Sequence, residues 1–238
     1  MIALAIDTCD ARGSVAVLRD EAVLKVLAHE SEEDYSSWLL PAVRQCLEGS
    51  GLRMQDVDAY AAATGPGSFT GVRVGLTSVK GWAEVYGKRI VAVSRLEAVG
   101  VEASGETAWV AAFFNAQRGQ VFGAVYRRNG KDLARSGDEM VIAPGKFVEG
   151  AAEVAKSEKI SWVSMDAECI VAVEAWKARE RRGERVESVS SVRAPMIGRL
   201  GLAALAEGRF TDALALDANY VRRSDAEIFW KGNAAHGR

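Results

Sequence analysis

Short apolar stretches alternate with turn-forming residues over the first part of the chain. Residues 2–6 (IALAI) and 14–18 (SVAVL) are separated by the turn-rich segment 7–13, and residues 22–28 follow an Arg-Asp turn. Apolar runs of this length, bounded by turn formers, are typical of β-strands. The pattern therefore predicts a β-meander at the start of the chain.

The spacing then changes to that of helices. Apolar residues in segment 36–47 recur at helical spacing, so we expect a helix there, with Pro41 either kinking it or lying in its first turn. Residues 58–64 and 90–94 are predicted as buried strands, and residues 70–86 between them as a second helix. The first part of the chain is thus expected to be an α/β unit, a mixed sheet flanked by helices.

The polar, glycine-containing segment 102–107 is the best candidate for a domain boundary. Two strand-like runs around a turn follow it, as at the start of the chain, which is consistent with an internal duplication. The later segments 144–155, 160–165, 170–182, 186–188 and 195–207 are expected to be helix, strand, helix, strand and helix. We therefore divide the chain into a first lobe, residues 1–104, and a second lobe, residues 105–238, whose C-terminal segment is able to return to the first.

The composition is that of a folded globular protein, with 49% apolar and 26% charged residues. The 30 Lys and Arg and 32 Asp and Glu give a formal net charge of −2, which supplies no field to attract nucleic-acid phosphates. RNA binding by the chain alone is therefore not expected. No stretch reaches the roughly 18 apolar residues of a membrane-spanning helix, and Asp7 ends the first apolar run too early for a signal sequence, so we expect a cytoplasmic protein.

The segment Gly65-Pro66-Gly67-Ser68-Phe69-Thr70-Gly71 joins a predicted strand to a predicted helix, where free backbone N–H groups can hold an anion. It lacks the GxxxxGK(S/T) spacing and any Lys, so nucleotide binding through Gly65 and Gly67 is the weaker interpretation. Asp7, at the end of the first strand, is either a carboxylate for hydrated Mg²⁺ beside a nucleotide or a turn residue bonded to its own backbone. Its counterpart in the second lobe is the uncharged Asn115, so we expect neither ATP hydrolysis nor a cofactor on the isolated chain.

The helix behind this loop carries a stripe of small residues that begins with Gly71 and Gly75. Each glycine inside a helix costs about 1 kcal/mol relative to Ala, so close approach of another helix should compensate for it. That helix is either the chain's own helix 36–47 or, if the stripe is exposed, part of a binding partner. Nine residues are the candidates for partner binding: Trp38, Leu39, Gly71, Val72, Gly75, Leu76, Ser78, Val79 and Trp82.

Residues for independent catalysis are scarce. The two histidines are His29 and His236, so one chain cannot assemble a His-pair metal site, and no local signature supports a Ser-His-Asp triad around His29. We therefore predict no catalytic residue and no metal site.

Several strings of this sequence resemble the TsaB (YeaZ) family. They are LAIDT at residues 4–8, GSVAV at 13–17, SWLLP at 37–41, VAVSRL at 91–96 and, above all, GPGSFTGVRVG at 65–75. The resemblance is dense over residues 2–99 and thin beyond them. The family is the dimerisation subunit of the bacterial complex that places threonylcarbamoyl on the N6 of an adenosine beside the tRNA anticodon.

The resemblance implies a two-lobed fold of the actin, sugar-kinase and Hsp70 kind (ASKHA), each lobe a mixed sheet flanked by helices. It also implies a scaffold, not catalytic alone, that binds the subunit TsaD through the helices 36–47 and 71–86 and contacts tRNA only through the complex. Mg-ATP or ADP and metal are then expected on the partner subunits, with the ATPase TsaE in the larger assembly and a homodimer through the same helices. The alternatives are an ATP-dependent enzyme of the same fold that uses Asp7 and the loop 65–71, and a glycoprotease-like peptidase.

Three positions depart from the family pattern. Tyr35 stands where relatives usually have His, Asn115-Ala116-Gln117 replaces Asp-Ala-Arg, and Gln120-Val121-Phe122 replaces Glu-Val-Tyr. The two changes in the second lobe weaken the case for nucleotide chemistry further.

Overall fold

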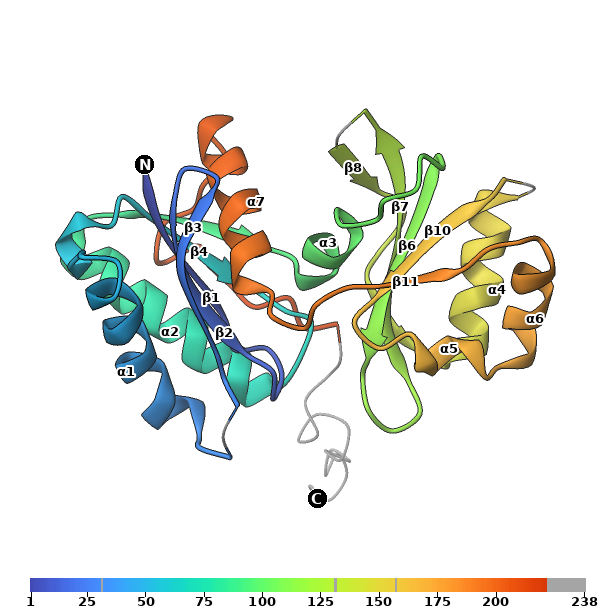
Figure 1. Ribbon diagram of the computed structural model, residues 1–238, viewed down its shortest axis with the longest axis horizontal. Coiled ribbons are helices and arrows are strands. Elements are labelled where there is room, and N and C mark those ends of the chain that lie inside the picture. The colour runs from blue at the N-terminus through green and yellow to red at the C-terminus, as the bar shows by residue number, and fades with distance from the viewer. Residues whose placement is uncertain (31, 131, 157, 222–238) are drawn as a thin grey trace, which may run out of the picture.

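The computed structural model describes residues 1–30, 32–130, 132–156 and 158–221, which form two β-sheets with helices on both faces of each (Figure 1). His236 and the C-terminal residues 233–238, for which a frayed tail is expected, lie outside the described residues. Within the described residues, no helix combines the length and the apolar character needed to cross a bilayer.

The two sheets share one plan. The first has the strand order β3-β2-β1-β4-β5, with β1, β2 and β3 antiparallel and β4 and β5 parallel to β1. The second has the order β8-β7-β6-β10-β11 with the same directions, and β9 pairs with β7. This repetition confirms the duplicated arrangement expected from the sequence.

The strands of the first sheet are β1 (Ile2–Asp7), β2 (Ser14–Arg19), β3 (Ala22–Ala28), β4 (Ala59–Ala63) and β5 (Arg89–Val93). Those of the second are β6 (Trp109–Asn115), β7 (Val121–Asn129), β8 (Asp132–Arg135), β9 (Met140–Ile142), β10 (Ile160–Ser164) and β11 (Val186–Ser188). In this alignment Asp7 and Asn115 both end the central strand of their sheet, as the sequence predicts.

The helices exchange between the two halves of the chain. The outer face of the first sheet carries α1 (Tyr35–Glu48) and α2 (Phe69–Tyr86), and its inner face carries α7 (Ala194–Ala206) from the end of the chain. The short α3 (Arg95–Gly100) instead packs on the second sheet, opposite α4 (Pro144–Ala155), α5 (Glu168–Val171) and α6 (Glu174–Arg181) (Figure 1). The predicted boundary at residue 104 therefore separates the sheets but not all of their helices, and the division into two domains stays a prediction.

Small residues let α7 press closely on the first sheet. A Cβ at Gly198 would lie 2.4 Å from Leu18 Cδ1, and one at Gly201 would lie 2.5 Å from Ala61 Cβ. Strand β4 (AYAAA) is wholly buried between helices, which explains a run that reads as strand despite its alanines.

One local expectation was wrong, one open choice is decided, and three short elements are added. The predicted helix 170–182 is broken into α5 and α6. On a continuous helix, Ile170 and Trp176 would point about 120° apart, because they are six positions apart. The break lets both side chains enter the same core. Of the two positions left open for Pro41, inside the helix or in its first turn, the structure has the first. Helix α3 and strands β8 and β9 were not predicted, since each is only three to six residues long.

Candidate functional site

A cavity of about 470 Å³ lies between the two sheets. Its walls come from the turn after β1, the start of α2, the first residue of α3, the end of β6 and the segment after β10. This is the position at which the carboxyl ends of the central strands of both sheets meet, which is where open α/β sheets commonly bind ligands. The cavity is therefore the first candidate site.

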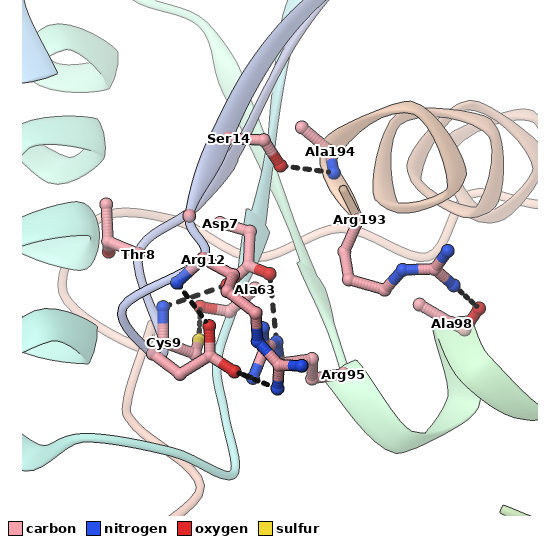
Figure 2. Close-up of polar contacts among 12 residues, drawn as sticks. Asp7, Thr8, Cys9, Arg12, Ser14, Ala63, Arg95, Ala98, Arg193 and Ala194 are labelled. Carbon is pink, nitrogen blue, oxygen red and sulfur yellow. Dashed lines mark hydrogen bonds and ion pairs between the residues drawn. The ribbon is translucent and has the colours of Figure 1, made fainter. Parts of the chain in front are cut away.

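Asp7 is fully buried behind the cavity-lining Arg95 and already has its partners. Its Oδ1 accepts a hydrogen bond from the backbone N–H of Cys9 at 2.9 Å, and its Oδ2 accepts one from Nε of Arg95 at 2.9 Å (Figure 2). The carboxylate thus caps its own turn and neutralises a buried guanidinium. The interpretation of Asp7 as a magnesium carboxylate does not fit this arrangement.

Ion pairs continue from Asp7 across the cavity to the second sheet. Arg95, which is fully buried, donates from Nη1 to Asp10 Oδ2 at 2.7 Å. Arg12 contacts the same Asp10 oxygen at 3.0 Å and reaches Asp166, after β10, at 2.6 and 3.1 Å. Burial raises the pKa of Asp10, but the charges and hydrogen bonds of Arg95 and Arg12 outweigh it and lower this pKa to about 2. Three carboxylates and two guanidinium groups therefore pair with one another within the chain, and among the described residues the buried Nη2 of Arg95 is left without a hydrogen-bond partner.

Two N–H groups at the start of α2, those of Ser68 and Gly71, already have partners within the protein. The N–H of Ser68 donates to the carbonyl of Cys9 at 2.5 Å, and the Ser68 hydroxyl accepts from the N–H of Gly71. A Cβ at Gly67 would lie 2.1 Å from the same Cys9 carbonyl, so this glycine serves close packing on the β1–β2 turn. Nucleotide binding through Gly65 and Gly67 stays the weaker prediction.

The carboxylates at this cavity are consequently paired with guanidinium groups, an arrangement that does not fit Mg-ATP. In the described part of the chain, no three His, Cys, Asp or Glu side chains gather where they could hold a metal ion. Asn115 makes backbone contacts, donating its N–H to Asp166 and accepting the N–H of Gln117 on Oδ1.

His29 is equally unsuited to act as a catalytic base. Its Nδ1 lies 3.0 Å from the carbonyl of Ala11 and its Nε2 lies 2.7 Å from the carbonyl of Glu33, so both ring nitrogens face backbone oxygens. The ring packs against Tyr35 and Trp38. This geometry offers no nitrogen to a serine hydroxyl, which a peptidase triad requires.

Tyr35, the first of the three departures, is a structural residue. Its hydroxyl accepts the N–H of Gly13 at 2.7 Å and donates to the carbonyl of Asp10. It thereby ties the start of α1 to the β1–β2 turn that carries the ion pairs.

A second candidate site lies on the outer face of the first sheet, between α1 and α2. It is a groove of about 490 Å³, and its walls are mostly apolar or hydroxyl-bearing. Leu40 on α1 is 58% exposed, an uncommon exposure for a leucine on a helix that otherwise packs on the core. Ten described residues line this groove: Tyr35, Ser36, Leu39, Leu40, Phe69, Thr70, Arg73, Val74, Thr77 and Ser78.

The stripe of small residues on α2 does not face this groove. A Cβ at Gly71 would lie 2.1 Å from the carbonyl oxygen of Thr8, and one at Gly75 would lie 2.4 Å from its Oγ1. The Thr8 hydroxyl also donates to the carbonyl of Gly71 at 2.7 Å. The two glycines therefore let α2 pack on the end of β1, and neither α1 nor a partner helix is what approaches them.

The nine candidates for partner binding fall into two groups. Leu39, Gly71, Val72, Gly75, Leu76 and Val79 are buried, whereas Trp38, Ser78 and Trp82 are partly exposed. Gly71 and Gly75 are thus buried, and they are not exposed as binding of a partner to the stripe would require. Leu39 and Ser78 do line the groove. The accessible surface lies beside the predicted stripe, and partner binding through α1 and α2 stays a prediction.

Both the sequence and the structure of this chain have relatives among known proteins. A family model described as "TsaD: tRNA N6-adenosine threonylcarbamoyltransferase" matches residues 26–184, more than half of the chain. The TsaB protein of Bacillus subtilis is 34% identical over 131 residues, which are 55% of this chain and 57% of that protein. The structure of YeaZ from Pseudomonas aeruginosa superimposes with a TM-score of 0.71 at 25% identity, covering 92% of this chain and 99% of that one. The chain belongs to the TsaB (YeaZ) family.

The chain spans about half the length of the curated relatives it matches. The two-lobed ASKHA fold implied by the resemblance is confirmed by YeaZ and by a ROK hexokinase from Thermus thermophilus, which aligns with a TM-score of 0.52 at 10% identity over 86% of this chain. The hexokinase likeness concerns the fold alone. This member of the TsaB family lines its cavity with its own paired charged side chains.

Sequence reasoning overlooked the residues that do so. Arg12, Arg95 and Asp166 were not recognised as a set, although Arg95 lies two residues after β5 and Asp166 two residues after β10. The ends of parallel strands share one edge of a sheet, so charged residues at these positions are a usable signal.

Proposed function

We propose that this chain is a docking subunit, not catalytic alone, that binds a TsaD-type partner and supports formation of N6-threonylcarbamoyladenosine in tRNA. Membership of the TsaB family supports the pathway, since two curated relatives are described as tRNA threonylcarbamoyladenosine biosynthesis proteins. The single observation that carries the non-catalytic role is the pairing of the buried Asp7 with Arg95. The carboxylate that an ATP-dependent member of this fold would use is thus already paired with an arginine of the same chain.

The groove between α1 and α2 supports the docking role. It combines an open apolar surface at Leu40 and Val74 with hydroxyl groups of Thr70 and Thr77 at its edge. A groove between two roughly neighbouring helices is suited to a helix of a partner, whose apolar side chains would fill it. Burial of a few central side chains usually dominates the affinity of such interfaces.

The remaining partners belong to the same proposal. Mg-ATP or ADP and the metal ion would reside on the partner subunits, TsaE would join the larger assembly, and tRNA would be contacted only through the complex. A homodimer through α1 and α2 would compete with TsaD for the same groove. The ATP-dependent enzyme and the peptidase have no supporting geometry, given the engaged carboxylates and the engaged ring nitrogens of His29.

Titration calorimetry with TsaD from the same organism tests the docking surface. The wild-type chain should bind with one-to-one stoichiometry, and Leu40→Asp should abolish binding because it places a charge on the apolar groove. Leu214→Asp is the matched control, since Leu214 is 95% exposed and lies outside the groove. Equal losses for both variants, or full binding by Leu40→Asp, would exclude this groove as the docking site.

A second titration, with Mg-ATP and the isolated chain, addresses the enzymatic alternative. We expect no stoichiometric binding, because Asp7, Asp10 and Asp166 are all paired with guanidinium groups. Tight binding at one nucleotide per chain would show that the ion pairs open for a ligand, and would favour the enzyme.

A further inference from the structure

Arg73 lines the groove between α1 and α2, the proposed docking face, and aromatic residues hold it in place. Its guanidinium carbon lies 3.6 Å from the ring centroid of Phe69, one helical turn away on α2. Its Nε donates to the hydroxyl of Tyr220 at 2.9 Å, and the Tyr220 ring lies 5.0 Å from that of Phe69. An arginine stacked in this way keeps its charge while losing much of its rotamer freedom before any partner arrives.

The tyrosine that orients Arg73 comes from a distant part of the chain. The segment after α7 pairs with the first sheet through Thr211 and Ile90 and again through the N–H of Asn219, which donates to the carbonyl of Thr64 at 2.8 Å. The Asn219 side chain also donates to Glu139 at 2.5 Å. These bonds of Asn219 to Thr64 and Glu139 hold Tyr220 against the start of α2.

The charge of the groove is set by this one residue. Among the ten described residues that line it, Arg73 is the only charged one. No carboxylate of the described residues lies within ion-pair distance of it, and the one hydrogen bond of its guanidinium in that part of the chain uses Nε. Within the described ranges, the two terminal nitrogens, which form the fork that fits a carboxylate, therefore have no partner, and Arg73 is exposed.

We propose that Arg73 is the specificity anchor of the docking face and receives a carboxylate carried by a helix of the heterologous partner. The inference rests on the proposed docking function and adds the chemistry of the partner: an apolar helix with an aspartate or glutamate positioned opposite Arg73, near the start of α2. Charge complementarity between a lone cation and a carboxylate fixes register and partner choice more than it adds affinity.

The same charge disfavours a second copy of this chain in the groove. In a two-fold symmetric dimer each copy offers the same surface to the other, so both would bring Arg73 and neither groove would supply an anion. A partner that brings a carboxylate gains an ion pair with Arg73 that self-association lacks, so binding of that partner is favoured. Arg73 thereby distinguishes TsaD from a homodimer that would use the same helices.

The experiment measures two dissociation constants for the full chain, one for TsaD from the same organism by calorimetry and one for self-association by sedimentation equilibrium. Arg73→Met should weaken TsaD binding by at least about tenfold, the usual effect of losing a charge-assisted hydrogen bond, and should reduce its salt dependence. Self-association should stay the same or strengthen. Arg73→Lys, which keeps the charge but lacks the fork, should lie between wild type and Arg73→Met.

Two further variants separate orientation from charge and from general effects. Tyr220→Phe keeps the ring and removes the hydroxyl that holds Nε, so a smaller loss of TsaD affinity is expected with an unchanged melting temperature. Arg181→Met, on the exposed end of α6 in the second half of the chain, is the matched control and should bind TsaD like wild type.

The outcomes distinguish the anchor from the docking function itself. If TsaD binds Arg73→Met as tightly as wild type, or if this variant weakens self-association by the same factor as TsaD binding, the anchor is refuted while docking stands. If wild-type protein does not bind TsaD at all, the proposed function fails and the anchor with it. A charge-reversed Arg73→Glu that regains binding when one acidic residue of TsaD is replaced by Arg would identify the partner carboxylate and support the inference.

Discussion

Replacement of Arg95 by methionine probes the ion pairs that fill the cavity. Arg95 and Asp7 are both fully buried, and the substitution removes the bonds from Arg95 to Asp7 at 2.9 Å and to Asp10 at 2.7 Å. Methionine retains most of the side-chain volume against Phe114, over whose ring the guanidinium lies at 5.0 Å. The dominant effect is therefore electrostatic.

Breaking a buried pair by removing one partner typically costs about 3–5 kcal/mol, because the remaining charge stays buried without compensation. After Arg95→Met the buried Asp7 would keep only the hydrogen bond from Cys9. For a protein of this size each kcal/mol lowers the melting temperature by about 2–4 °C, so a decrease on the order of 10 °C is expected. Differential scanning calorimetry and urea unfolding measure the two quantities.

A double variant, Arg95→Met with Asp7→Asn, is the control. It removes both charges of the pair, so it should recover at least half of the stability lost in the single variant. Two results would refute the claim that Arg95 and Asp7 compensate each other's buried charge. One is a loss of stability below about 1 kcal/mol in Arg95→Met, and the other is a double variant that is no more stable than the single one.

Three other variants test separate contacts. Because the two guanidinium groups beside Asp10 depress its pKa to about 2, Asp10 contributes stability that is fully present above about pH 4 and lost as the pH falls toward 2, about 2 kcal/mol in all. Asp10→Asn should lack this part of the acid dependence in urea unfolding, and an unchanged pH profile would contradict the assignment. Gly75→Leu should lower the melting temperature by several degrees even without a partner, because its Cβ would collide with Thr8 Oγ1; full stability would show that the stripe is external after all. Tyr35→Phe removes the acceptor of the Gly13 N–H and should cost about 1–2 kcal/mol in urea unfolding, whereas no change would mean that water replaces the hydroxyl.

Much of the fold was accessible from local patterns. The bounds of α4 and β11 agree with those read from the sequence, since each has a clear start signal or a short apolar run between turns. The repeated meander likewise predicted two sheets of the same plan. Short elements such as α3 escaped, because six residues carry too little periodicity to be recognised.

The candidate sites show where local reasoning ends. The cost of Gly71 and Gly75 correctly indicated a close contact, but the contacting group, Thr8, lies more than sixty positions away and is not encoded in the helix. The pairing of Arg95 with Asp7 joins residues 88 positions apart. The sequence shows which residues can form ion pairs or allow close packing. Which residues they contact depends on how the two sheets meet.

Reconstituted tRNA modification tests the central claim, docking without catalysis, most directly. Formation of N6-threonylcarbamoyladenosine would be measured with TsaD and its companion proteins in the presence of wild-type chain, Leu40→Asp, or the double variant Asp7→Asn with Arg95→Met. We predict that the double variant supports modification at a temperature where it is folded, whereas Leu40→Asp does not. Loss of modification with the folded double variant, together with full modification by Leu40→Asp, would place the function in the cavity and contradict this account.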